Sequence, residues 1–61
     1  MQIIANGNTF DVTVKPIKRG SWVVQIDTVN GLYDGYWFGE IRSEREARQA
    51  ARVYCNRYTE A

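Results

Sequence analysis

The side chains best suited to recognition chemistry in this 61-residue sequence are arginines near its carboxyl end. Arg45, Arg48 and Arg52 recur at spacings of three and four, which places them along one side of a helix. Such a basic row can neutralise successive phosphates of a nucleic acid. Because a helix also needs a polar outer face, a merely solvated surface explains the same row. Two further arginines stand near its ends, Arg42 and Arg57.

Catalytic chemistry has few candidates. The chain has no histidine, so the usual general base near neutral pH is missing, and a cysteine–histidine zinc site cannot be built. Asp27 and Asp34 flank a turn-rich segment, where solvated acids are expected. Cys55 is the one cysteine and has no histidine to activate it, which favours a small apolar filler. We therefore expect a non-enzymatic protein without a cofactor.

Aromatic residues offer a second kind of recognition surface. Consecutive strand residues point to opposite faces, so at least one of Tyr36, Trp37 and Phe38 should face solvent. Exposed Trp and Tyr side chains anchor protein interfaces and also stack on unpaired bases. In so short a chain several aromatics must instead fill the core. The sequence leaves open a protein-docking site at Tyr33, Tyr36 and Trp37.

The first forty residues carry the pattern of strands. Alternation of apolar and polar residues predicts strands over about 2–5, 9–15, 21–28 and 35–41, with Trp22, Val24 and Ile26 facing the core. Asn-Gly at 6–7 predicts a tight hairpin, Pro16 is expected to end the second strand, and 28–35 is expected to be a loop. Gly39 breaks the alternation and suggests a bulge. Whether Trp37 or Phe38 is then exposed stays open.

A helix over about 43–58 should close the sheet. Ser43 to Glu46 has the form of a capping box, in which the serine hydroxyl accepts from the third helical amide. An apolar stripe follows and Glu44 stands four residues before Arg48, a favourable ion-pair spacing. The fold class predicted is α+β, a three- or four-stranded antiparallel meander packed against one C-terminal α-helix. The stripe consists of Ala47, Ala50, Ala51, Tyr54 and Tyr58.

Length and composition limit the remaining possibilities. Sixty-one residues are expected to form a single domain (1–61) with a thin core, so a homodimer is left open as a way to bury more surface. No apolar run approaches the roughly 18 residues of a membrane span, and no signal peptide is recognised. A lone cysteine without an export signal predicts a cytoplasmic protein.

Residues 20–51 resemble a known family. Gly20 to Ile26, Trp37 to Ser43, Glu46-Ala47 and Ala50-Ala51 are similar to the ethylene-responsive-factor type of DNA-binding domain and to the arm-binding domains of phage and transposon integrases. The resemblance implies a sheet packed on one helix and major-groove binding through the exposed sheet face. The family has several arginines on that face and this chain has none at the corresponding strand positions. The groove-facing positions would be Lys15, Gln25, Asp27 and Trp37, with Arg19 near the turn.

Together these patterns predict a nucleic-acid-binding accessory protein of phage or mobile-element type. The alternative is a protein–protein interaction module, an adaptor or inhibitor, that docks through Tyr33, Tyr36 and Trp37. In the first case Gln25 and Trp37 contact bases, and six basic residues contact the backbone: Lys15, Lys18, Arg19, Arg45, Arg48 and Arg52.

Overall fold

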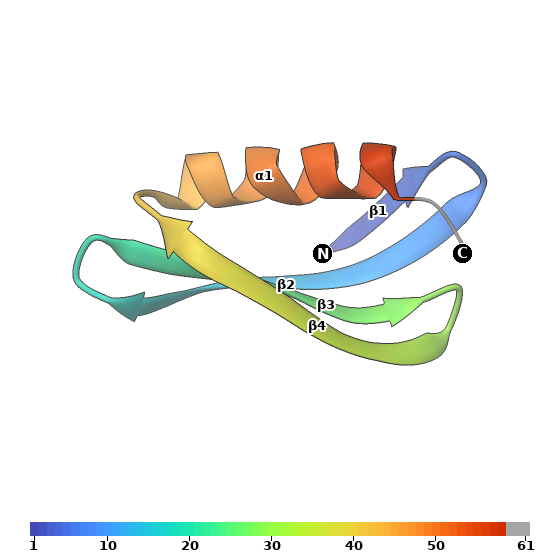
Figure 1. Cartoon of the computed structure of the whole chain (residues 1–61), viewed down its shortest axis with the longest axis horizontal. Helices are drawn as coiled ribbons and strands as arrows, with labels where there is room; N and C mark the ends of the chain where they lie inside the picture. The colour runs from blue at the N-terminus through green and yellow to red at the C-terminus, as the bar shows by residue number, and fades with distance from the viewer. Residues whose placement is uncertain (59–61) are drawn as a thin grey trace.

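The computed structural model describes residues 1–58 and shows four strands followed by one helix. The strands β1 (Gln2–Ala5), β2 (Asn8–Lys18), β3 (Ser21–Val29) and β4 (Leu32–Ile41) form one antiparallel sheet in that order. The helix α1 (Glu44–Arg57) packs against one face of the sheet (Figure 1). The predicted α+β meander with a C-terminal helix is confirmed. Within the described chain, no helix is long and apolar enough to cross a membrane.

The core lies between α1 and the inner face of the sheet. Phe10 of β2 and Ile26 of β3 are fully buried there, as the alternation of the strands predicts. The helix contributes the small side chains of Ala47, Ala51 and Cys55, which are also fully buried. Small side chains let the helix axis approach the sheet closely. Cys55 thus serves as an apolar filler, and its thiol is free.

The connection between β3 and β4 is shorter than predicted. Asn30 (φ 55°) and Gly31 (φ 81°) both adopt the left-handed conformation, so two residues reverse the chain and β4 begins at Leu32. The predicted loop over 28–35 is therefore wrong. The second turn signal, Asp34-Gly35, lies instead at an irregularity within β4, where these two residues oppose one residue of β3, Asp27.

Pro16 does not end the second strand. β2 continues to Lys18, and Pro16 stands opposite Trp22 of β3. On its other side β2 is paired with β1 only as far as Asp11 in the strand register, so Pro16 lies on an open edge. An edge tolerates proline because the missing N–H is not needed for a neighbouring strand. The prediction that Pro16 ends the strand failed for this reason.

A bulge near Gly39 decides which aromatic residue of β4 is exposed. Trp22 pairs with Ile41 and Val24 pairs with Phe38, so two residues of β4, Gly39 and Glu40, lie opposite one residue of β3. Glu40 takes up the extra residue in the left-handed conformation, with φ 67°. Phe38 and Ile41 can therefore both pack against the core, whereas Trp37 points away and is 65% exposed. The predicted bulge is confirmed.

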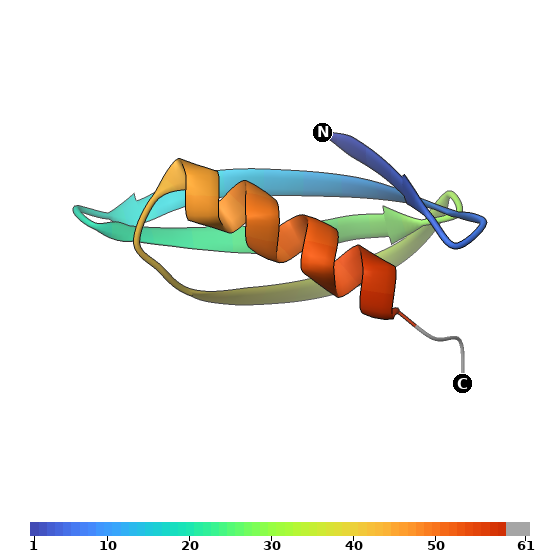
Figure 2. The same cartoon turned by 90° about the horizontal axis from the view of Figure 1, so that it is seen from above.

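The start of α1 is fixed by local contacts, and its orientation leaves a groove beside β4. The Ser43 hydroxyl accepts a hydrogen bond from the Glu46 amide at 3.1 Å, and Arg48 pairs with Glu44 at 3.2 Å, as the sequence predicts. Seen from above, α1 crosses the strands obliquely, and part of β4 lies beside the helix (Figure 2). A groove is left open between α1 and β4.

Candidate binding surfaces

The outer face of the sheet, opposite α1, carries a shallow apolar hollow of about 340 Å³. Gln25 pairs with Trp37 and Lys15 pairs with Val23, which brings side chains from three strands together. Val23 is only 5% exposed although no helix covers this face, because its neighbours on the sheet surround it. We call this surface the outer hollow; its residues are Lys15, Ile17, Val23, Gln25 and Trp37.

A polar half adjoins the outer hollow on the same face. The Asp27 carboxylate accepts from the Thr13 hydroxyl at 2.6 Å and from the Gln25 amide. The Asp11 carboxylate accepts from the Thr28 hydroxyl at 2.8 Å. Both acids are thus held by neutral donors rather than by basic side chains. The outer face is therefore apolar toward the β2–β3 turn and acidic toward the other end.

The three aromatic residues proposed for protein docking do not share one surface. Tyr33 is 88% exposed, and its ring lies so close to Gly35 that a methyl group there would meet its hydroxyl at 2.7 Å. Trp37 belongs to the outer hollow. Tyr36 turns to the helix side, where its ring stacks on Tyr54 with centroids 5.2 Å apart. The structure thus places Tyr36 on the opposite side of β4 from Trp37.

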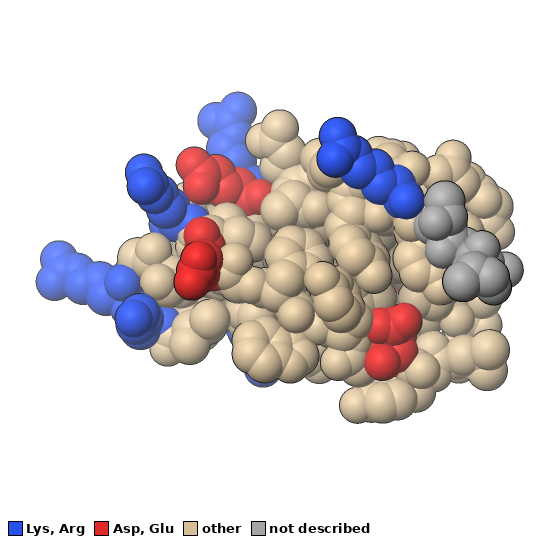
Figure 3. Space-filling view, in the orientation of Figure 1, with Lys and Arg blue, Asp and Glu red and all other residues tan. Residues whose placement is uncertain are grey.

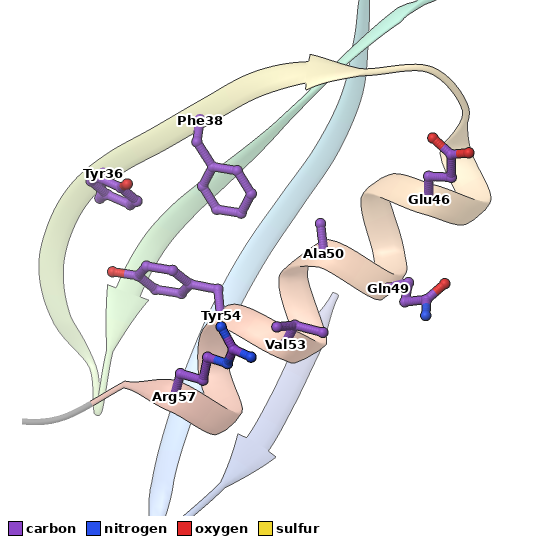
Figure 4. Close-up of a pocket in the computed structure, with 8 residues that line it drawn as sticks. All are labelled: Tyr36, Phe38, Glu46, Gln49, Ala50, Val53, Tyr54 and Arg57. Atoms are coloured by element: carbon purple, nitrogen blue, oxygen red, sulfur yellow. The ribbon is translucent and has the colours of Figure 1, made fainter.

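The groove between α1 and β4 is a hollow of about 590 Å³. The rings of Tyr36 and Phe38 point from β4 toward Tyr54, while Val53 and Ala50 form the helix side (Figure 4). Val53 is 44% exposed. We call this surface the helix–strand groove; its rim is formed by Glu46, Gln49 and Arg57.

Two groups near this groove have perturbed acidity. Burial raises the pKa of the Tyr54 hydroxyl above its ordinary value, and the negative charge of Asp34 adds to the effect. Burial alone raises the pKa of the Cys55 thiol. Both shifts favour the neutral form, so neither group is an activated nucleophile. Among residues 1–58, no three His, Cys, Asp or Glu side chains are grouped to hold a metal ion.

The basic residues lie on a different part of the molecule. Arg45, Arg48 and Arg52 border one shallow hollow on the exposed side of α1, away from the outer face of the sheet. Lysine and arginine side chains gather at the end of the molecule that holds both the β2–β3 turn and the start of α1 (Figure 3). We call this surface the basic end. The β2–β3 turn supplies Lys18 and Arg19, the end of β4 and its connection to α1 supply Glu40 and Arg42, and the first turns of α1 supply Glu44, Arg45, Glu46 and Arg48.

No protein-family model, curated protein or solved structure matches this chain. The resemblance to DNA-binding domains is therefore supported only at the level of the fold, a meander sheet with a C-terminal helix.

The structure divides the predicted nucleic-acid site. Lys15, Gln25 and Trp37 come together in the outer hollow, whereas the three helix arginines lie on the other side of the sheet. Sequence reasoning missed Ile17, because the strand was expected to end at Pro16, and it missed Val53. The signal was present in both cases: Ile17 is a large apolar residue between Pro16 and Lys18, and Val53 follows Arg52 outside the predicted apolar stripe.

Proposed function

We propose that this chain is a non-enzymatic binding module that docks a protein partner on the outer face of its sheet. The observation that carries the proposal is the outer hollow, in which Trp37 stays 65% exposed over a nearly buried Val23. A large aromatic residue on a rigid apolar floor is typical of the residues that dominate binding energy at protein interfaces.

The surroundings of Trp37 support the same function. Ile17 is more than half exposed beside it, and the two extend one apolar patch across β2, β3 and β4. Asp27 and Asp11 border the patch with hydrogen-bonded carboxylates, which suits the polar rim of an interface. These acids oppose a polyanionic partner at this face, because phosphates would be repelled.

Affinity capture with two baits tests the proposal. The wild-type protein and Trp37→Ala are immobilised and exposed to extracts of the cells that make this protein, at about 0.5 M salt, where exposed charge pairs are screened. We expect a protein that is retained by the wild type and lost with Trp37→Ala. Tyr36→Ala, on the other side of β4, is the control and should retain it. If no captured protein distinguishes Trp37→Ala from the wild type, the outer hollow is not the docking site.

Nucleic-acid binding is the second candidate, and the basic end favours it. Lys18 and Arg19 at the β2–β3 turn lie at the same end of the molecule as Arg42 and Arg45, so one phosphate backbone can be contacted by both elements. Anisotropy of a labelled duplex and a labelled single strand should then show binding that weakens steeply with salt. The Lys18→Glu/Arg19→Glu variant should lose it. No binding of either probe at tens of micromolar protein and low salt rejects this candidate.

A further inference from the structure

The helix side of the helix–strand groove carries a sequence pattern that complements itself. Glu46, Ala50, Val53 and Arg57 follow one another at spacings of four, three and four. With 3.6 residues per turn, these four positions lie within about 60° of one another around the helix axis. The row has an acid at its first end, a base at its last end, and a small and a larger apolar residue between them.

We propose that this row pairs with the same row of a second copy of the chain, with the two α1 helices antiparallel. A two-fold axis between Ala51 and Arg52 places Glu46 opposite Arg57 of the second copy. It also places Ala50 opposite Val53. The two flanking residues of the groove, Gln49 and Tyr54, face each other under the same symmetry.

Charge and size favour a second copy as the occupant. In a two-fold interface every contact occurs twice, so a surface that carries opposite charges at its two ends matches its own reversed copy. Alanine opposite valine lets the helices approach closely at the centre, and the antiparallel orientation opposes the two helix dipoles favourably. The exposed part of Val53 and the half-exposed ring of Tyr36 would then be covered.

The proposed contact between the two helices is short, so we expect a weak dimer. From Glu46 to Arg57 the row extends about 16 Å along the helix axis, at about 1.5 Å per residue. Stable interfaces bury about 800 Å² on each partner, more than one such face supplies. We therefore expect dimers at protein concentrations on the order of 10–100 µM. The dimer leaves both outer hollows free, and the inference does not depend on the docking function proposed for them.

Sedimentation velocity from about 5 to 500 µM tests the pairing with two charge reversals. In Glu46→Arg, the new arginine of each copy faces Arg57 of the other copy, so self-association should weaken at least tenfold. Arg57→Glu should have the same effect through two facing acids. An equimolar mixture of the two variants restores opposite charges at the ends of the paired rows, and its heterodimer should form within about threefold of the wild-type affinity. Glu44→Arg, in the same turn but outside the row, should dimerise like the wild type.

Three results would overturn the inference: a wild-type protein that stays monomeric at 500 µM, single variants that dimerise as before, or a mixture that stays monomeric. Circular dichroism establishes that each variant is folded. If a charge reversal unfolds the chain, the test uses the wild type alone. NMR spectra of its backbone amides are then recorded over the same dilution series. Shifts that depend on concentration should then fall at Ala50 and Val53 and not at Ile17 or Trp37; the reverse distribution rejects the pairing.

Discussion

The left-handed backbone at Glu40 predicts that glycine stabilises this position. A non-glycine residue at φ 67° costs about 1–2 kcal/mol, because its Cβ crowds the following carbonyl. Glycine removes that cost but adds about 0.4–1 kcal/mol of chain entropy to the unfolded state. The difference leaves Glu40→Gly more stable than the wild type by about 0.5–1 kcal/mol. For a domain of this size, the melting temperature should rise by about 3–6 °C.

Urea unfolding followed by tryptophan fluorescence measures this difference, with thermal unfolding as a second reading. Glu40→Ala is the matched control: it removes the same carboxylate but keeps the Cβ, so its stability should change by less than about 0.5 kcal/mol. The reasoning is refuted if Glu40→Gly is no more stable than Glu40→Ala. In that case the left-handed backbone at this position carries no net cost for a residue with a Cβ.

Three further outcomes are expected. Ser43→Ala should lower the free energy of unfolding by about 1 kcal/mol, because the Glu46 amide loses its acceptor; chemical denaturation measures it, and an unchanged midpoint would mean that water replaces the cap. Because burial raises the pKa of Cys55 above its ordinary 9.0, the unfolded chain releases the thiol proton first, so stability should fall as pH rises above about 9 and fall less in Cys55→Ala. Trp37→Ala should cost at most about 2 kcal/mol, since only about a third of that side chain is buried, and a cooperative melt should persist; loss of the melt would make Trp37 a core residue.

The sequence predicts the fold well where patterns are local. Alternation identifies the buried faces of β2 and β3, and the serine cap marks the start of α1, because both signals depend on neighbours within a few residues. Pro16 and the segment 28–35 were misjudged for one common reason. Proline and turn residues have several uses, and the strand pairing around them decides which one applies.

The binding surfaces were less predictable than the fold. Alternation alone could not decide whether Trp37 faces the core or solvent. The extra residue at Glu40 shifts the register, so the residues before it point to the opposite face of the sheet from the one that strict alternation with Ile41 would give. The outer hollow combines residues from three strands, and the helix–strand groove depends on the oblique crossing of α1. Such surfaces follow from packing angles and register, which no single segment specifies. A row such as Glu46 to Arg57 becomes meaningful once the structure shows that it borders an open groove.

The meander order of the strands has a consequence for folding during synthesis. Each strand pairs with the strand that precedes it in the chain, so the hairpins can form one after another as residues emerge. The inner face of the sheet is covered only by α1, which is made last. At about 5–20 residues per second, the helix follows the completed sheet by roughly one to three seconds. A chain that ends before α1 leaves Phe10, Val24 and Ile26 without cover, so it would expose them to other chains.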